Sequence, residues 1–282
     1  MTATQNQDAE REFAFNKQDF QFIAQWSYER TGIVLHENKA DMVYSRLARR
    51  LRALKMKSVS EYCEMLKTSQ GDAEIGNLVN AITTNLTSFF RESHHFEHLR
   101  KQVLEPFAQS KSERLRIWSA GCSAGAEPYC IAMMMQESIP QIDRRDCKIL
   151  ATDIDTNMLE KGQKGEYAAD WIDKIPAPWS MKYAEAISGK TDEKRMVKKL
   201  RDLIAFKPLN LMEDWPMKGK FDAIFCRNVV IYFDKPTQKV LFERYANALK
   251  DGGYLYIGHS ETLNHVCDRF KLIDKTTYQK MT

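Results

Sequence analysis

The sequence predicts an α/β fold preceded by an all-helical segment, and two observations support this. After about residue 112, short apolar runs such as RLRIWSAG and CKILATDID alternate with helical stretches such as PYCIAMMMQESI. This order is typical of a parallel sheet with helices on both faces. Before residue 86, apolar residues recur at helical spacing and no strong strand pattern is present. We therefore expect an N-terminal helical domain over residues 1–85 and an α/β domain over residues 86–282.

The helical domain is predicted to begin with a frayed tail, residues 1–15, and to contain roughly four helices. One of them has an apolar stripe formed by Val43, Leu47, Leu51 and Leu54. Residues 41–60 hold six basic side chains and only one acid, a net charge of +5, so the rest of the chain sums to −1. The basic residues are Arg46, Arg49, Arg50, Arg52, Lys55 and Lys57.

Composition limits the class of protein. The chain has 282 residues, 42 Lys plus Arg, 38 Asp plus Glu and a net charge of +4, which is too mild to indicate a nucleic-acid binder. Its 43% apolar content excludes a largely disordered chain. No apolar run is long enough for a transmembrane helix, and the polar N-terminus does not resemble a secretory signal. Six cysteines without a C-x-x-C pair indicate reduced thiols. We expect a cytoplasmic protein.

The first strand of the α/β domain runs into a turn of small residues, Gly121-Cys122-Ser123-Ala124-Gly125. Small residues allow a ligand to approach the backbone closely. The turn lacks the lysine of a G-x-x-x-x-G-K-S/T phosphate loop, which disfavours ATP or GTP hydrolysis. Glu127, at the start of the next helix, would repel a pyrophosphate and would favour a cationic ligand.

The second strand ends in Asp153, a position at which an acidic residue typically binds the ribose hydroxyls of an adenosine cofactor. A ligand with an adenosine, a sulfonium and an ammonium group fits Asp153 and Glu127 together, and S-adenosyl-L-methionine has all three. The alternative is an ordinary tight turn with Asp153 as a helix N-cap. The third strand places Arg227, Asn228 and Tyr232 beyond its carboxyl end. No N/D-P-P-Y/F motif follows, which argues against methylation of base nitrogens.

Residues 166–206 interrupt the alternation of strands and helices. The segments SMKYAEA, KRMVKKL and DLIAF are interpreted as three short strands of an inserted antiparallel subdomain, with Gly189 in a hairpin turn. The alternative is a long loop plus one helix.

A set of short motifs spread along the chain carries a family resemblance. They are Gly32–Leu35 with Asp41–Tyr44, Thr83–Arg91, Trp118–Ser123, Glu127–Tyr129, Thr152–Asp155, Cys226–Asn228 with Ile231–Asp234, and Gly258–Glu261. By these motifs the chain, from about residue 16 to 280, resembles the CheR family of chemotaxis-receptor glutamate methyltransferases. Its turn reads S-A-G-A-E-P over 123–128 where the family commonly has S-T-G-E-E-P, which leaves the effect of Ala124 and Ala126 on cofactor affinity open.

The resemblance implies a class I S-adenosylmethionine-dependent methyltransferase domain of Rossmann-like fold, with an inserted antiparallel β-subdomain at about 166–206. It implies a protein-glutamate O-methyltransferase of chemotactic adaptation, with S-adenosyl-L-homocysteine as product. Arg91 and Tyr232 would lie nearest the transferred methyl group as catalytic residues. The cofactor would contact Asn85, Thr87, Arg91, Glu127, Asp153, Asn210, Leu211, Arg227 and Asn228.

The family also implies partners. Arg46, Arg49, Arg50 and Arg52 would bind an acidic helical bundle of the receptor's cytoplasmic domain. The alternatives are a solvated helix face and non-specific nucleic-acid binding. In some family members the β-subdomain docks a peptide from the receptor's C-terminus by strand addition. For this chain we expect a monomer, with no metal, no nucleic acid and no membrane insertion. A non-catalytic cofactor-sensing, receptor-binding module is the alternative function.

Overall fold

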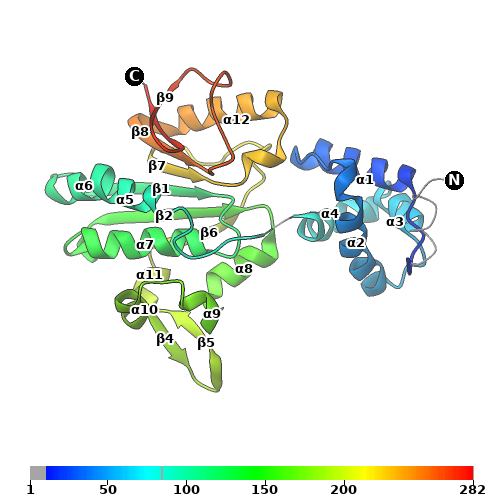
Figure 1. The fold of residues 1–282 in the computed structure, drawn as a ribbon, viewed down its shortest axis with the longest axis horizontal. Coiled ribbons are helices and arrows are strands. Elements are labelled where there is room, and N and C mark those ends of the chain that lie inside the picture. Colours follow the sequence, from blue (N-terminus) through cyan, green and yellow to red (C-terminus); the bar gives the residue numbers. More distant parts are fainter. Residues whose placement is uncertain (1–10, 84, 282) are drawn as a thin grey trace. The chain divides into compact units, whose positions relative to one another are not determined.

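The computed structural model describes residues 11–83 and 85–281, apart from the side chain of Asp72. Within this part of the chain no helix is both long and apolar enough to cross a membrane. The chain divides into two compact units, Met1–Thr84 with Tyr232–Asp234, and Asn85–Ile231 with Lys235–Thr282. We describe each unit by itself (Figure 1).

The first unit is helical. A capping box between Asn16 and Asp19 begins the first helix, and Gly32 ends it in the left-handed conformation, with φ of 72°. The side chains of Ser58 and Thr68 cap the third and fourth helices. The α-helices are α1 (Lys17–Thr31), α2 (Ala40–Leu54), α3 (Val59–Leu66) and α4 (Ser69–Ile82), with a 3₁₀ turn at Glu37–Lys39.

The core of this unit includes more of the N-terminus than the sequence indicates. Phe13 and Phe15 are buried in the same cluster as Leu47 and Leu51 of α2. Residues 1–10 of the expected tail lie outside the described residues, whereas residues 11–15 are packed. Two aromatic side chains bury enough apolar surface to order a short segment that has no helical pattern of its own.

The second unit contains a seven-stranded mixed sheet in the order β6-β2-β1-β7-β8-β10-β9. Strands β6, β2, β1, β7 and β8 are parallel, while β10 pairs antiparallel with β8 and β9. The bounds are β1 (Arg114–Ala120), β2 (Asp146–Asp153), β6 (Ile204–Pro208), β7 (Phe221–Cys226), β8 (Leu249–Ile257), β9 (Phe270–Asp274) and β10 (Thr277–Lys280).

Helices cover both faces of this sheet. Ile117 and Trp118 are neighbours in β1, so their side chains point to opposite faces. Ile117 belongs to the main core cluster, with the apolar residues of α7. The Trp118 ring packs on the other face against Tyr245 of α12, with the two ring centroids 5.4 Å apart. The helices are α5 (His94–Leu99), a π-helical turn (Arg100–Leu104), α6 (Glu105–Gln109), α7 (Ala126–Ser138), α8 (Thr156–Lys164) and α12 (Lys235–Ala248), with 3₁₀ turns at Ile142–Arg144 and Val230–Tyr232.

The inserted segment forms a separate three-stranded antiparallel sheet in the order β3-β5-β4. Gly189, with φ of 78°, makes the turn between β4 and β5. The expected strand DLIAF is not part of this sheet, because β6 pairs in parallel with β2. Much of SMKYAEA and KRMVKKL is helical. The elements are β3 (Glu166–Ala168), α9 (Ala169–Ile172), α10 (Ala177–Tyr183), β4 (Ala184–Ile187), β5 (Lys190–Met196) and α11 (Lys198–Arg201).

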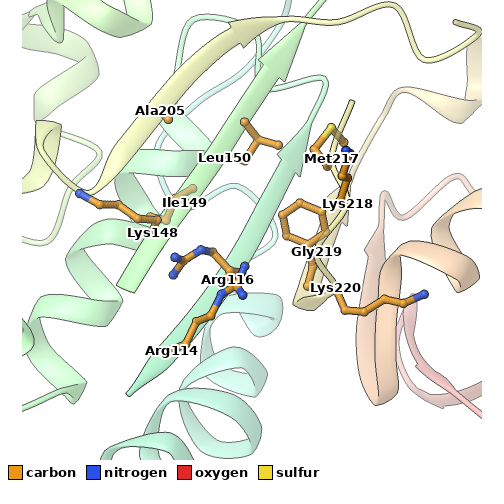
Figure 2. Close-up of a pocket in the computed structure, with 11 residues that line it drawn as sticks. Arg114, Arg116, Lys148, Ile149, Leu150, Ala205, Met217, Lys218, Gly219 and Lys220 are labelled. Atoms are coloured by element: carbon orange, nitrogen blue, oxygen red, sulfur yellow. The ribbon is translucent and has the colours of Figure 1, made fainter. Parts of the chain in front are cut away.

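The two ends of the main sheet differ in character. The carboxyl ends of β1, β2 and β7 lead into the turns that carry the predicted site residues. At the amino ends of the same strands, basic side chains line a pocket (Figure 2). Gly252 and Gly253 lie inside β8, where the pairing with β7 shifts register.

Candidate cofactor site

The turn after β1 is built for close approach of backbone segments. Gly121 has a φ of +77°, and a Cβ atom there would lie 2.3 Å from Cγ2 of Val229. Its N–H donates to the carbonyl oxygen of Thr152 at 2.8 Å, which ties the end of β1 to the end of β2. Gly125, with φ of 90°, begins α7 in a left-handed conformation that favours glycine. No other residue could occupy Gly121 without strain and a clash.

Asp153 lies at the tip of β2, held by backbone groups. Its carboxylate accepts the N–H of Ser123 at 2.7 Å and that of Asp155 at 2.9 Å. Burial raises the pKa of Asp153 to about 6 despite these hydrogen bonds. Asp153 does not cap the following helix, because the side chain of Asp155 accepts the first N–H groups of α8. The helix-cap alternative for Asp153 is therefore wrong.

Three further predicted residues lie near Asp153. The Asn85 side chain donates to Oδ2 of Asp155 at 2.7 Å, and Ser123 Oγ donates to the Asn85 carbonyl oxygen at 3.4 Å. The loop after β6 reaches the same place, since the N–H of Leu209 donates to the carbonyl oxygen of Asp153 at 3.0 Å. That loop carries Asn210 and Leu211. The structure thus brings Asn85, Asp153, Asn210 and Leu211 to one region.

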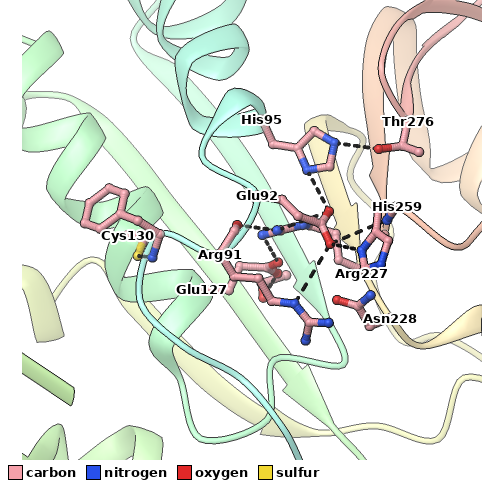
Figure 3. A network of polar contacts seen from close by, with 12 residues as sticks. Arg91, Glu92, His95, Glu127, Cys130, Arg227, Asn228, His259 and Thr276 are labelled. Atoms are coloured by element: carbon pink, nitrogen blue, oxygen red, sulfur yellow. Dashed lines mark hydrogen bonds and ion pairs between the residues drawn. The ribbon is translucent and has the colours of Figure 1, made fainter. Parts of the chain in front are cut away.

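A second group of predicted residues meets around Arg227, which is almost completely buried (Figure 3). Its Nη1 donates to Oε2 of Glu127 at 3.1 Å, and its Nη2 donates to the carbonyl oxygen of Arg91. The other oxygen of Glu127 accepts the Ser119 hydroxyl at 2.7 Å. Burial raises the pKa of Glu127, although Arg227 and Ser119 oppose this effect. Arg227 therefore connects the turn after β1 to the segment that contains Arg91.

Glu92 is a second acidic partner of Arg227 that the sequence did not single out. Its Oε2 lies 3.4 Å from Nη2 of Arg227, and its Oε1 lies 2.9 Å from Nδ1 of His259. Burial opposes ionisation of Glu92, but the hydrogen bond from His259 and the charge of Arg227 outweigh it and lower the pKa. Within the described residues, Glu92 Oε2 and Arg227 Nε have no hydrogen-bond partner, although both are buried.

Glu261 anchors the turn after β7 in a similar way. Its carboxylate accepts the backbone N–H groups of Gly258, Asn228 (3.0 Å) and Ile231 (3.2 Å). Burial raises the pKa of Glu261, and the backbone donors counteract that effect. Glu261 therefore positions the segment 227–231. It appears in the motif Gly258–Glu261, yet no sequence signal distinguishes a carboxylate that binds a turn from one that binds a ligand.

Backbone strain is concentrated in these segments. Phe90, Glu92, Ser123 and Asn228 all have positive φ, at 53°, 54°, 49° and 59°. Such conformations cost free energy in non-glycine residues and persist where the surrounding structure imposes them. Each of these residues lies in or next to a predicted contact segment. Strain of this kind is typical of preorganised binding sites.

The contacts of three other predicted residues, Thr87, Arg91 and Tyr232, do not show what role these residues have. Thr87 is half-buried, and Thr84 of the same motif lies outside the described residues. Arg91 donates to the carbonyl oxygen of Leu86 at 2.9 Å, while the Leu86 side chain is 80% exposed. Tyr232 groups with the helical unit, where its carbonyl oxygen accepts the N–H of Val34 at 2.9 Å. The role of Tyr232 beside the methyl group stays a prediction.

The basic residues of α2 are not equivalent. Arg46 donates to the carbonyl oxygens of Ala81, Ile82 and Thr83 at the end of α4, and Arg50 pairs with the buried carboxylate of Glu74. Arg52 pairs with Glu12 at 3.0 Å on the surface. Arg49 is exposed and forms no hydrogen bond or ion pair with another described residue. Two of the four arginines therefore hold helices together, whereas Arg49 and Arg52 are exposed, and the alternative of a solvated helix face stays open for these two.

The residues at the carboxyl edge suit S-adenosylmethionine. Two buried carboxylates, Glu127 and Asp153, have raised pKa values, so a cation or a hydroxyl donor would stabilise their ionised forms. Ala124 and Ala126, where the turn departs from the common family sequence, both fit their surroundings. Ala126 is fully buried at the start of α7, and the carbonyl oxygen of Ala124 accepts the Tyr167 hydroxyl at 2.6 Å.

Comparison with known proteins identifies the family. Residues 85–279 match the model described as "CheR methyltransferase, SAM binding domain", and residues 18–83 match "CheR methyltransferase, all-alpha domain". The chain is 43% identical over 262 residues to a probable chemotaxis protein methyltransferase of Rhizobium etli, an alignment that covers 90% of this chain and 97% of that protein.

Two further relatives agree. Chemotaxis protein methyltransferase 2 of Pseudomonas aeruginosa is 42% identical, over 95% of each chain. The chemotaxis protein methyltransferase of Escherichia coli is 40% identical, over 94% of this chain and 91% of the relative. These matches span both units and include every predicted contact segment of the carboxyl edge. The chain therefore belongs to the CheR methyltransferase family.

Proposed function

We propose that this protein transfers a methyl group from S-adenosylmethionine to glutamate side-chain carboxylates in the cytoplasmic helices of chemoreceptors, forming glutamyl methyl esters during chemotactic adaptation. The names of the relatives support a methyltransferase of chemotaxis. The observation that carries the proposal is the polar network at the carboxyl edge of the sheet. It joins Arg91 to Arg227, which are 136 residues apart, and places Glu127 between the two segments.

The bound cofactor supplies an electrophilic methyl group on a sulfonium. In our proposal Asp153 accepts hydrogen bonds from the ribose hydroxyls, and Glu127 interacts with the cationic amino acid part. Asn210 and Leu211 lie on the adenine side, since their loop follows β6 next to Asp153. Asn85, Thr87, Arg227 and Asn228 complete the contacts. Arg227 favours the ionised form of Glu127, because its guanidinium opposes the rise in pKa that burial causes.

The reaction asks little of the protein in acid–base terms. A glutamate side chain has an ordinary pKa of about 4.3, so the attacking carboxylate is already ionised at neutral pH. Catalysis can therefore consist mainly of in-line positioning of the reacting atoms. In our proposal the Arg91 guanidinium orients the attacking carboxylate, while Tyr232 packs beside the methyl group. The hydrogen bond from Arg91 to the Leu86 carbonyl oxygen restricts the arginine before substrate arrives.

The receptor would be recognised by charge. Of the four arginines, Arg49 is exposed and forms no ion pair with another described residue, and Arg46 and Arg52 lie on the same helix. Positive charge on α2 would attract an acidic helical substrate and hold its register. In the β-subdomain, β3 and β4 are the outer strands of the small sheet, so either edge could pair with an added peptide strand.

The experiment that tests the proposal uses methyl-labelled S-adenosylmethionine and a purified cytoplasmic fragment of a chemoreceptor from the same organism. We expect label on the receptor fragment that is released as methanol by mild base, as an ester would be. A fragment with glutamine in place of the candidate glutamates is the matched control and should remain unlabelled. Base-stable label, or no label on the glutamate fragment, would contradict the proposal.

A further inference from the structure

A cationic pocket lies at the amino ends of β1, β2 and β7, at the opposite edge of the sheet from the candidate cofactor site. Its volume is about 240 Å³, smaller than a typical site for a drug-sized ligand. Five basic residues contribute to its lining, and no acidic residue does. They are Arg114 and Arg116 of β1, Lys148 of β2, and Lys218 and Lys220 of the loop that leads into β7.

The strand register brings like charges together. Arg116 pairs directly with Lys148 across β1 and β2, and Arg114 lies two residues earlier on the same face of β1 as Arg116. Figure 2 shows the Arg114 and Arg116 side chains close together, with the ammonium groups of Lys148 and Lys220 toward opposite sides. Like charges directly opposite one another destabilise a sheet. An anion bound between them would remove that cost.

Carboxylates outside the pocket lining offset part of this charge. Asp146 lies near Arg114, Arg116 and Lys148, while Asp202 lies near Lys148 and Asp251 near Lys220. Asp146 pairs with Arg116 at 2.6 Å, and Asp222 pairs with Lys250 at 2.5 Å, outside the pocket lining. The hydrogen bond from Arg116, with the charges of Arg114 and Lys148, lowers the pKa of Asp146. Among the described residues, none of Arg114, Lys148, Lys218 and Lys220 forms an ion pair with a carboxylate.

The basic groups also remain available for a ligand. Lys148 and Lys220 donate only to neutral carbonyl oxygens, those of Asp202 and Asn247. The Arg114 guanidinium packs against Gly219, where a Cβ atom would lie 2.9 Å from its Nη2. Leu150, which lies two residues after Lys148 on the same face of β2, and Phe221 contribute apolar side chains to the lining. Low-dielectric walls beneath several cations strengthen the positive potential in a pocket.

We propose that this pocket binds the diphosphate group of a small ligand. The guanidinium fork binds phosphate oxygens in pairs, and the ammonium groups supply further charge. A diphosphate presents negative charge on two adjacent groups, which suits a lining with several neighbouring cations better than a single carboxylate does. Inorganic pyrophosphate and a nucleoside diphosphate share this chemistry. The proposal does not depend on the methyl-transfer function.

Calorimetric titration with pyrophosphate, at fixed ionic strength, tests the proposal on the full-length protein. We expect one molecule to bind per chain, and the double substitution Arg114→Gln with Lys218→Gln to weaken binding by about tenfold or more, since charge-assisted hydrogen bonds are lost. These two side chains donate no hydrogen bond to another described residue, so the fold should be retained. The matched control, Lys174→Gln with Lys239→Gln, removes two exposed lysines elsewhere in the same unit and should bind normally.

Two parallel measurements sharpen the result. Binding of S-adenosylhomocysteine should be equal in all variants and undisturbed by pyrophosphate, which shows that the fold is intact and the two sites are separate. Tighter binding of ADP than of pyrophosphate would support a nucleotide as the ligand, and the reverse would support the inorganic anion. Equal pyrophosphate affinity in the Arg114/Lys218 variant, displacement of S-adenosylhomocysteine, or no binding by the parent protein would overturn the proposal.

Discussion

The Nη1 atom of Arg227 lies 3.1 Å from Oε2 of Glu127, although 100 residues separate them in the chain. Arg227 also faces Glu92, so one nearly buried guanidinium serves two nearly buried carboxylates. Removing one partner of a buried ion pair is far more costly than removing one from the surface, because the remaining charge is left without compensation.

Substituting Arg227 by Met should therefore lower the free energy of unfolding by about 3–5 kcal/mol. Denaturation in urea measures this loss. It should be larger at pH 8 than at pH 5, because the pKa of Glu127 rises further without Arg227 and the folded state then holds a proton that the unfolded state releases. Arg100→Met, which breaks solvent-accessible pairs with Glu97 and Glu105, should cost less than about 1 kcal/mol. A loss at position 227 no greater than at position 100 would contradict the network.

Asp153→Asn should weaken S-adenosylhomocysteine binding by about tenfold or more, because one hydroxyl acceptor is lost. In the parent protein, affinity should fall as the pH drops below about 6, the pKa of Asp153, since the protonated carboxyl no longer accepts both hydroxyls. The variant should lack this dependence. Calorimetry between pH 5 and 8 measures both, and parallel pH profiles of parent and variant would exclude Asp153 as the titrating contact.

The same raised pKa makes a prediction for stability. The folded protein keeps the Asp153 proton up to about pH 6, whereas the unfolded chain loses it near the ordinary value of 3.8. The contribution of protonated Asp153 to the free energy of unfolding is therefore present at low pH and is lost as the pH rises from about 4 to 6. Urea midpoints measured across this range should decline less steeply in Asp153→Asn. If the urea midpoints of Asp153→Asn decline with pH as steeply as those of the parent protein, Asp153 does not cause the decline.

Arg91→Ala should lower turnover by about a hundredfold with little change in melting temperature, since a positioning donor is lost while the fold is kept. The backbone carbonyl oxygen of residue 91, which accepts from Arg227, is unaffected by the substitution. Initial-rate kinetics with a receptor fragment should show the loss in kcat. Turnover equal to that of the parent protein would exclude the role proposed for Arg91.

Arg49 and Arg50 should separate recognition from stability. Arg50→Gln removes the charged partner of Glu74, which is only 5% exposed, and should cost about 1–3 kcal/mol. Arg49→Gln should leave stability unchanged, raise the KM for the receptor fragment and weaken its salt dependence. If KM and its salt dependence are the same for Arg49→Gln as for the parent, this part of α2 does not contact the substrate.

Gly121→Ala should disrupt the turn after β1, because the new Cβ would lie 2.3 Å from Val229 and φ is +77°. We expect a loss of stability of about 2–3 kcal/mol with weaker S-adenosylhomocysteine binding. Adding Val229→Ala removes the clash but not the backbone strain, so it should restore part of the stability. If the single variant Gly121→Ala has the same melting temperature as the parent protein, the turn is less constrained than the geometry implies.

Local patterns predicted much of the fold. Helical spacing indicated the helices before residue 86, and alternating apolar segments indicated β1, β2, β7 and β8. The pairing between strands that are distant in sequence was harder to predict. The segment DLIAF resembles any short apolar strand, and only its parallel pairing with β2 shows that it belongs to the main sheet. Strand periodicity reports a buried face but not the identity of the neighbour.

In the candidate cofactor site, too, local patterns do not identify partners that are distant in sequence. Asp153 and Glu127 follow strand ends, so their positions could be inferred from topology. Glu92 could not, because its importance comes from Arg227 and His259, which lie more than a hundred residues away in sequence. Arg50 resembles a solvated basic residue until α4 brings Glu74 beside it. Long-range partners determine whether a charged side chain is free, and no local pattern contains them.

A crystal structure with S-adenosylhomocysteine tests the central claim most directly. The account predicts that the ligand lies at the carboxyl ends of β1 and β2, with oxygens of Asp153 within about 3 Å of the ribose hydroxyls and Glu127 beside the amino acid part. The pocket at the amino ends of the strands should contain none of it. A ligand bound elsewhere, with Asp153 and Glu127 keeping only their internal partners, would contradict the account.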